Sequence, residues 1–342
     1  MFRVHVRRLS KLGAIGILMI SMMSCGSDEG ATTETTGAAP TEIGVIGYVV
    51  AGDRNDGGYY QGQVDAVEIA ATKFGFKLIV VDNVNPGASR EAFENLARQS
   101  PDLIIAGGNE LAEGFLPVSE APEYSEITFL LVSGGPPQGS TYATVGANEN
   151  EAHYVGGVAM GLLLKRTKAS TACIVAGPEL PFVLDMAKSM KAGLASIAPD
   201  AKLLVTFTGD FENAALAQEA VAAQINQGCQ VVYPYLGGAI LAVLIAGQEA
   251  GINLTSTSVD RCGDPSTKFA MAITYNPSLF LEATIADFGK GMVIEGEQYR
   301  LFGIGDGVGV GANICDATDE EKAAIDKAVA SIVSGEVAGW TS

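Results

Sequence analysis

The hydrophobic positions of the chain follow two alternating spacings. Residues 43–50 form one continuous apolar, β-branched run, which predicts a strand that is buried on both faces. From Tyr59 to Ala71, apolar side chains recur every three or four residues, which predicts an amphipathic helix. Between them, residues 51–58 form a polar loop rich in turn-forming residues. A strand, a polar loop and a helix start in this order are typical of a ligand site at the carboxyl ends of parallel strands.

The same alternation continues along the chain in two rounds of similar length. Further strands are expected at residues 76–81, 103–106, 128–132, 143–146, 172–176, 202–208, 230–235, 255–259, 269–275 and 298–302. Further helices are expected at residues 89–99, 111–119, 148–164, 186–197, 214–226, 239–250, 277–289 and 319–333. Strands that alternate with helices predict parallel sheets with right-handed crossovers. The predicted fold class is therefore α/β, with two similar, doubly wound, parallel-sheet lobes.

The last part of the chain departs from this alternation and returns to both lobes. We expect the helix at 277–289 to join the first lobe and the helix at 319–333 to join the second, after a glycine-rich crossing. The chain would then pass between the lobes three times, which makes a hinge. The expected N-terminal lobe comprises residues 41–146 plus 277–300, and the C-terminal lobe comprises residues 147–276 plus 301–342.

The composition fits a large globular protein with an acidic surface. Of the 342 residues, 48% are hydrophobic and 18% are charged, so a large core can form and disorder is not expected beyond the N-terminal segment. The length suffices for about two domains. The formal net charge is -18, which argues against nucleic acid as a partner, because phosphate binding needs a basic surface.

The N-terminal segment has the features of an export signal. Residues 1–24 begin with basic side chains and continue with an apolar run too short to span a bilayer, which predicts a lipoprotein signal peptide. The run ends in a small residue followed by Cys25, which resembles the lipobox of bacterial lipoproteins, where the cysteine is lipidated. An ordinary cleaved signal peptide is the alternative. Residues 25–40 are small and polar, which predicts a flexible tether that holds an exported protein at the outer face of the bacterial cell membrane, or in the periplasm.

The four remaining cysteines can form disulfides, because an exported protein meets an oxidising environment. Four thiols allow three complete pairings, and sequence alone cannot choose between them. Their positions beside predicted strands favour Cys173–Cys229 and Cys262–Cys315, and free buried cysteines are the alternative. No Cys-x-x-Cys motif occurs and the chain has only two histidines, so we expect no metal site and no cofactor.

Polar and aromatic side chains gather at the predicted carboxyl ends of strands. The first loop carries Asn55 and Asp56, and Tyr59 and Tyr60 follow it. Four more candidates fall at the ends of other predicted strands: Asn109, Phe182, Tyr235 and Asn276. Amides, carboxylates and aromatic faces together suit the recognition of a base or a pentose. Turn chemistry, helix capping or core packing is the alternative at each position.

Five short segments are informative in combination. They are the Asn55-Asp56 loop, Glu151-Ala-His-Tyr-Val-Gly-Gly157, Gly209-Asp-Phe-Glu-Asn213, Val259-Asp260 and Gly307-Val-Gly-Val-Gly311. Their order and spacing resemble the basic membrane protein family of ABC-importer substrate-binding proteins, whose best-known members are purine-nucleoside-binding lipoproteins. The resemblance covers nearly all of the chain after the export signal. It implies a monomer with the type I periplasmic-binding fold and no enzymatic activity, which binds a small molecule and docks on the transmembrane subunits of an ABC permease.

The resemblance also implies roles for individual residues. Phe211 would stack on a purine, and Asp260 would hold ribose hydroxyls. Asn55 and Asp56 would act from the first lobe, and one of the two tyrosines after that loop would provide the opposing aromatic face. Gly237, in the turn after a predicted strand, belongs to the same ligand-binding set.

Two departures from the family pattern concern the ligand. The family often has Ser-x-x-Lys shortly after the region of Asp260, whereas residues 273–277 of this chain contain no lysine. The strand whose family pattern ends in Asp ends here in Ser133. Arg261 either compensates for the missing lysine or indicates another ligand.

The predicted function is therefore a lipid-anchored substrate-binding protein of an ABC importer, which captures a purine nucleoside or a related purine by hinge closure. A simple sugar is the alternative ligand, and a ligand-sensing lipoprotein or adhesin of the same fold is the alternative role. An enzyme is disfavoured, because the chain has no Gly-x-Ser-x-Gly and no Walker motif. Ser133 is a weak nucleophile candidate without a visible base.

Overall fold

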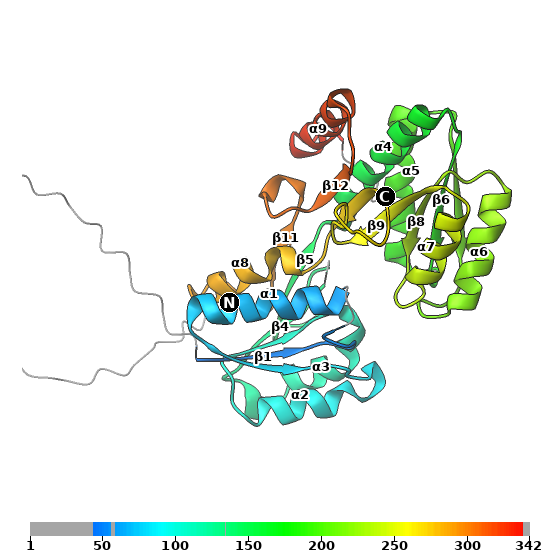
Figure 1. Ribbon diagram of the computed structural model, residues 1–342. Helices are drawn as coiled ribbons and strands as arrows, with labels where there is room; N and C mark the ends of the chain where they lie inside the picture. The colour runs from blue at the N-terminus through cyan, green and yellow to red at the C-terminus, as the bar shows by residue number, and fades with distance from the viewer. Residues whose placement is uncertain (1–43, 56–58, 134, 338–342) are drawn as a thin grey trace, which may run out of the picture. The chain divides into compact units, whose positions relative to one another are not determined.

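A computed structural model describes residues 44–55, 59–133 and 135–337. The expected signal peptide, Cys25, the tether and Asp56 lie outside the described residues. The described part of the chain folds into two six-stranded sheets, each with helices on both faces (Figure 1). None of the helices in these ranges combines the length and the hydrophobicity that a bilayer-spanning segment requires.

The first sheet is parallel throughout and has the strand order β11-β5-β4-β3-β1-β2. Its strands are β1 (Val45–Val49), β2 (Lys77–Val81), β3 (Leu103–Ala106), β4 (Thr128–Val132), β5 (Ala143–Ala147) and β11 (Gln298–Phe302). Its helices are α1 (Tyr59–Phe74) and α8 (Ser278–Phe288) on one face, and α2 (Ser89–Ala97) and α3 (Ala112–Ser119) on the other, with short 3-10 turns at Pro86–Ala88, Asn109–Leu111 and Pro122–Tyr124 (Figure 1). Because side chains alternate along a strand, Tyr48 packs on the α1 side and Val49 on the α2 side.

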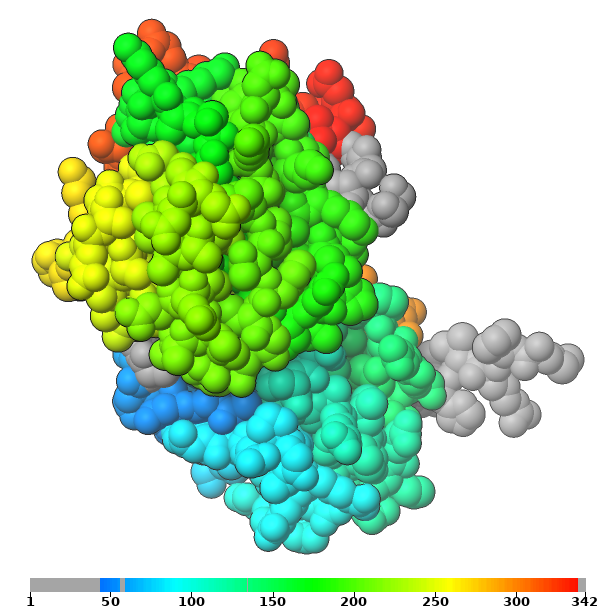
Figure 2. Space-filling model, turned by 90° about the vertical axis from the view of Figure 1, so that its right-hand side faces the viewer, coloured from blue at the N-terminus to red at the C-terminus, as the bar shows by residue number. Residues whose placement is uncertain are grey.

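The second sheet has the strand order β12-β10-β9-β8-β6-β7. Its strands are β6 (Thr171–Ala176), β7 (Lys202–Phe207), β8 (Val231–Tyr235), β9 (Asn253–Ser258), β10 (Phe269–Thr274) and β12 (Gly311–Ile314). Its helices are α4 (Glu149–Thr167) and α5 (Pro181–Ile197) on one face, α6 (Ala214–Asn226) and α7 (Ile240–Glu249) on the other, and α9 (Asp319–Val333), which packs on α4. The surface of α6 and α7 is the green to yellow region that faces the viewer in Figure 2.

The two sheets confirm the predicted α/β class with two lobes, but β12 was not predicted as a strand, because its residues fall in the expected glycine-rich crossing. β12 is antiparallel to β10, and Gly311 pairs with Thr274 at the carboxyl end of β10. The chain enters β12 from the crossing after β11, so it starts at the carboxyl edge of the second sheet and must run back along it. β11 itself ends at Phe302, so residues 301–302, which the sequence analysis assigned to the second lobe, pair in the first sheet.

Three connections join the first sheet to the second: β5 to α4, β10 to α8, and β11 to β12. Glu151 on α4 ties the first connection to the third, because its carboxylate accepts hydrogen bonds from Asn148 Nδ2 (2.7 Å) and from the backbone N–H of Ile304 (2.8 Å). The bond from Ile304 holds the start of α4 against the chain that leaves β11, and the bond from Asn148 orients the Glu151 carboxylate. The first and third connections are therefore fastened to one another.

Two disulfides fasten the second lobe. Cys173 of β6 is bonded to Cys229, just before β8, and both are fully buried in the core under α6 and α7. Cys262 is bonded to Cys315, just after β12. These are the two pairings that the strand positions favoured. Cys262 lies in the loop 259–268, which joins the parallel neighbours β9 and β10 without a helix.

Candidate ligand-binding site

Two tyrosines begin α1 at the carboxyl edge of the first sheet. The rings of Tyr59 and Tyr60 meet edge to face with their centroids 5.3 Å apart, and both side chains are half-buried. The hydroxyl of Tyr60 donates to Oε1 of Glu110 (3.1 Å), just after β3. A Cβ on Gly52 would overlap the Tyr60 ring, so the first loop can approach α1 closely only with glycine there. The first lobe thus presents aromatic faces beside a carboxylate.

A buried polar pair lies one helical turn below Tyr59. The hydroxyl of Tyr48 donates to Oε1 of Gln63 (2.5 Å), and both side chains are fully buried. Nε2 of Gln63 has no hydrogen-bond partner in the described part of the chain. Leaving a buried donor unpaired costs free energy. The amide nitrogen of Gln63 is such a donor, and it lies in the interior beneath Tyr59.

In the second lobe, four aromatic rings lie together near the carboxyl edge of the sheet. Tyr233 and Tyr235 are two residues apart on β8, so both side chains point to the same face of the sheet, toward α4. His153 belongs to α4, and Tyr275 follows β10. The centroid of the His153 ring lies 5.5 Å from that of Tyr233, 5.7 Å from that of Tyr235 and 5.2 Å from that of Tyr275. Tyr235 lies at the carboxyl end of its strand and is half-buried, whereas His153 and Tyr233 are fully buried.

Hydrogen bonds define the proton positions in this cluster. Nδ1 of His153 lies 2.6 Å from the backbone carbonyl of Glu149, which can only accept, so Nδ1 carries the proton. Nε2 must then accept from the Tyr233 hydroxyl, 2.8 Å away. The Tyr233 proton is used in that bond, so the Tyr275 hydroxyl, 3.3 Å away, donates to the Tyr233 oxygen. Burial lowers the pKa of His153 to about 3, which keeps the imidazole neutral near pH 7.

Glu149 is the carboxyl group beside these rings. It is the first residue of α4 and half-buried, and its Oε2 accepts a hydrogen bond from the Tyr235 hydroxyl (3.0 Å). Desolvation raises the pKa of Glu149 to about 7, and the Tyr235 bond opposes that rise. Burial raises the pKa of Tyr59, and the negative charges of Glu110 and Glu149 raise it further. Tyr59 therefore interacts electrostatically with a carboxyl group of each lobe.

Asp260 follows β9 and is exposed. Its Oδ1 accepts from the backbone N–H of Cys262 (2.8 Å), and its Oδ2 accepts from Nδ2 of Asn313 on β12 (3.1 Å). The disulfide of Cys262 with Cys315 fixes the same loop to the end of β12. The carboxylate is thus held from two sides.

The two phenylalanine candidates have different surroundings. Phe182, at the start of α5, is 54% exposed, and its ring centroid lies 6.4 Å from that of Tyr235. Phe211 is half-buried and covers Gly177, where a Cβ would overlap the ring. The Phe211 carbonyl accepts from the backbone N–H of Gly237 (3.0 Å). The loops after β7 and β8 are therefore joined, and Phe182 has the ring with more surface available to a ligand.

The remaining candidates from the sequence are placed as follows. Asn55 is exposed, and its Nδ2 and backbone N–H both donate to Oδ1 of Asp53. Asn109 is exposed at the carboxyl end of β3, and Arg261 is half-buried beside Asp260.

Asn276 is fully buried, and its amide connects the lobes. Its Nδ2 donates to the backbone carbonyl of Tyr59 (3.3 Å) and to Oγ of Ser258 (3.0 Å). Its Oδ1 accepts from the backbone N–H of Ser278 (2.9 Å). The amide is engaged in the connection from β10 to α8, where it links α1 of the first lobe to β9 of the second.

The structure adds residues that sequence reasoning did not select: Gln63, Glu110, Glu149, His153, Tyr233 and Tyr275. Two signals for them were present. The alternation of Tyr233 and Tyr235 along one strand indicates that both face the same helix. The spacing of four between Glu149 and His153 indicates neighbours on one face of α4.

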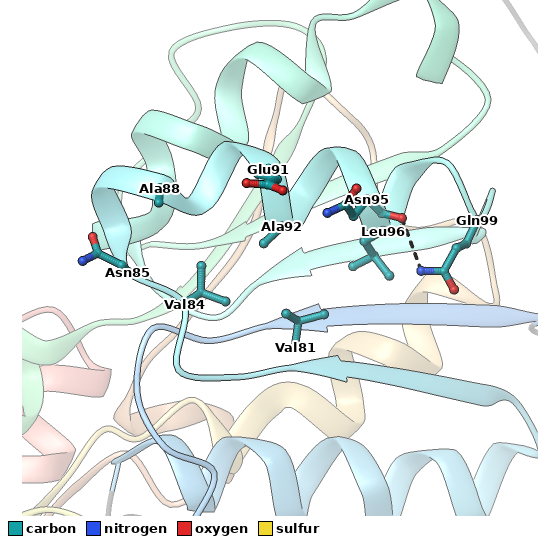
Figure 3. Close-up of a pocket in the computed structure, with 9 residues that line it drawn as sticks. All are labelled: Val81, Val84, Asn85, Ala88, Glu91, Ala92, Asn95, Leu96 and Gln99. Atoms are coloured by element: carbon teal, nitrogen blue, oxygen red, sulfur yellow. Dashed lines mark hydrogen bonds between the residues drawn. The ribbon is translucent and has the colours of Figure 1, made fainter.

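A hollow on the outside of the first lobe lies apart from these residues. It has a volume of about 360 Å³ and lies between the end of β2 and α2 (Figure 3). Val81, Val84 and Leu96 form its apolar part, and Asn95 and Gln99 are joined at its rim by a hydrogen bond of 3.3 Å. None of the candidate ligand-binding residues lines it, and elements of one lobe alone form it.

The fold and this arrangement define a class of protein. Two α/β lobes, three connections, and aromatic and carboxylate side chains at the carboxyl ends of strands are the features of two-lobed solute-binding proteins. No cluster of histidine, cysteine and acidic side chains within the described ranges is placed to hold a metal ion.

Comparison with known proteins gives the family. Residues 43–337 match the Bmp family, described as ABC transporter substrate-binding protein PnrA-like, and the chain belongs to this family. The family is one of substrate-binding proteins of ABC transporters and not of enzymes. The nucleoside-binding protein BmpA of an ABC transporter from Lactococcus lactis is 24% identical over 207 residues, which are 55% of this chain and 57% of BmpA. The chain thus spans less than two thirds of this curated relative.

Solved structures show the same fold. An ABC transporter solute-binding protein from Aeropyrum pernix K1 superposes with a TM-score of 0.72 at 17% identity, over 86% of this chain and 92% of the other. A second one, from Conexibacter woesei, has a TM-score of 0.69 at 19% identity, over 86% and 98% of the two chains. Both are solute-binding proteins of ABC transport systems, in agreement with the predicted type I periplasmic-binding fold.

Proposed function

We propose that this protein captures a purine nucleoside, or a related purine, between its lobes for an ABC importer. The observation that carries the proposal is the combination of Tyr59 on the first lobe with Phe182 and Tyr235 on the second. Aromatic faces from two sides suit a planar base. Glu110 and Asp260 supply acceptors for the hydroxyl groups of a ribose. The name of the Lactococcus relative agrees with this ligand class.

Binding would proceed by a shift between open and closed arrangements of the lobes. Glu151 joins the first and third connections, and Asn276 links α1 to β9 at the second, so the lobes can move as bodies about these connections. A ligand that contacts both lobes binds the closed arrangement better and therefore increases its population. The closed form would then dock on the permease.

The ligand class is tested by thermal unfolding with a panel of nucleosides, bases and monosaccharides. We expect purine nucleosides to raise the melting temperature, because a ligand that binds only the folded state stabilises it. Asp260→Ala should abolish that rise. Asp264→Ala is the matched control, because this half-buried aspartate of the same loop accepts hydrogen bonds from its neighbours Ser266 and Thr267. A rise with monosaccharides alone would instead establish a sugar-binding protein, and a full rise in Asp260→Ala would show that the site is elsewhere.

We also propose that Cys25 carries the lipid that keeps the exported protein at the membrane. The support is the basic and apolar segment before it, which ends in a small residue. In the native bacterial host, Cys25→Ser should move the protein from the membrane fraction to the soluble exported fraction. An unchanged membrane fraction in this variant would contradict lipidation at Cys25.

A further inference from the structure

Glu149 is a carboxyl group in an apolar setting without a cation beside it. Its Oε2 accepts from the Tyr235 hydroxyl (3.0 Å), and the ring centroids of Tyr233 and Tyr275 lie 6.0 Å and 6.2 Å from that of Tyr235. None of the ion pairs among the described residues includes Glu149. Removing a carboxylate from water without a partner costs free energy. A ligand that donates hydrogen bonds would supply the missing partner.

The surroundings of Glu149 restrict the chemistry of such a ligand. A carboxylate only accepts hydrogen bonds, and its two oxygens can receive two parallel donors. Tyr235, bonded to Glu149, has its ring centroid 6.2 Å from that of Tyr275, and these aromatic rings favour a planar ligand ring over a saturated one. A guanine-type base presents a ring N–H next to an amino group, which are two parallel donors. Hypoxanthine lacks the amino group. Adenine has an amino group, but the ring nitrogen beside it carries no proton.

We propose that Glu149, oriented by Tyr235, selects the base by accepting hydrogen bonds from two adjacent N–H groups of a guanine-type ring. The inference rests on the proposed function and names the ligand within that class. It assigns Glu149 to ligand contact and makes Tyr235 a positioning residue through its hydroxyl. This contact would replace polar contacts that the chain lacks at its two departures from the family pattern. Residues 273–277 contain no lysine, and Ser133 stands where the pattern has Asp.

Protonation of Glu149 gives a second readout. A protonated carboxyl group loses one acceptor position, so guanosine should bind more weakly as the pH falls through about 7, where Glu149 titrates in the free protein. The titratable groups that interact with Glu149 are Tyr235 and Tyr233 of β8, Tyr275 after β10, Tyr59 of α1 and His153 of its own helix. Burial raises the pKa of these tyrosines and lowers that of His153, so none of them titrates between pH 6 and 8.

The test is calorimetric titration of the full exported protein with guanosine, inosine and adenosine between pH 6 and 8. At pH 7.5 we expect guanosine to bind at least about tenfold more tightly than the other two, the scale of one charge-assisted hydrogen bond. Glu149→Gln should reduce this preference to about threefold or less and remove its pH dependence. Tyr235→Phe, which keeps the ring, should reduce the preference partially. Glu219→Gln on the exposed face of α6 is the control and should behave as the wild type.

The outcomes separate the two proposals. If the protein binds none of the three nucleosides, the proposed function fails. If guanosine and inosine bind equally tightly and Glu149→Gln changes neither, nucleoside binding stands and the role of Glu149 is wrong. If Glu149→Gln weakens all three nucleosides equally, Glu149 supports the site without selecting the base, which also overturns the inference.

Discussion

At the scale of single residues, His153 shows how a buried group acquires a defined protonation state. The carbonyl of Glu149 fixes the proton on Nδ1, and the Tyr233 hydroxyl then has to donate to Nε2. Without the imidazole, that hydroxyl would lack its acceptor in the core, at a cost of about 1–3 kcal/mol. The chain of bonds joins α4, β8 and the end of β10, so it also fixes the rings beside Glu149.

The same residues show what sequence could and could not provide. Tyr59 follows the loop after the first predicted strand, Tyr235 ends another, and the family resemblance implied Asp260; all three lie at the carboxyl edges of the sheets. Glu149 and Tyr275 come together only through the order of strands in the second sheet, which no local pattern contains. Asn276 also follows a strand, but an amide can bind a ligand or link two segments of a hinge equally well. Only the structure shows that its amide bonds to Tyr59 and Ser258 in the interior.

At the scale of elements, the loop 259–268 is an uncommon connection. Two adjacent parallel strands are joined by it without a helix, so no packed helix fixes its position. The Cys262–Cys315 disulfide and the bond from Asn313 to Asp260 take over that role. Opening this disulfide should therefore disturb Asp260, which lies two residues from Cys262.

A comparison of the two disulfides tests this role. Their sequence separations are 56 and 53, so the loss of chain restriction predicts a similar cost of about 4 kcal/mol in the free energy of unfolding for each. Cys262→Ala with Cys315→Ala should in addition weaken ligand binding several-fold. Cys173→Ala with Cys229→Ala should leave binding nearly unchanged, because that bond lies in the core under α6 and α7. Urea unfolding and calorimetric titration measure the two effects; equal affinities in both variants would contradict a positioning role for Cys262–Cys315.

Helices and strands could be predicted from the sequence where the spacing of their hydrophobic residues reflects which faces are buried. Strands buried on both faces and helices with one apolar face leave clear periodicities, and the two lobes follow from their alternation. The direction of β12 could not be predicted in this way. It depends on the edge of the sheet at which the chain re-enters the second lobe, which is a property of the connection from β11.

At the scale of the whole molecule, two neighbouring groups act on stability in opposite directions as the pH changes. The pKa of Glu149 is about 7 in the folded protein and about 4.5 when unfolded, so the folded state binds more protons between these values. This group therefore makes the folded state less stable as the pH rises from 4.5 to 7. The pKa of His153 is about 3 when folded and 6.5 when unfolded, so it makes the folded state more stable as the pH rises from 3 to 6.5.

Between pH 5 and 6.5 the two effects oppose each other, so the ligand-free wild type should show a nearly flat free energy of unfolding. Glu149→Gln removes one of them. We expect its free energy of unfolding to rise by about 1–2 kcal/mol from pH 5 to 6.5, below the limit of about 1.4 kcal/mol per pH unit for one proton, because the unfolded His153 is only partly protonated as the pH approaches 6.5. The difference between variant and wild type should grow up to pH 7 and then remain constant. Urea unfolding at four pH values measures it, and carboxylates with lowered pKa values, such as Asp82 and Asp316, contribute equally to both proteins. Parallel pH profiles of the two proteins would show that Glu149 keeps an ordinary pKa, and would remove the opposition between it and His153.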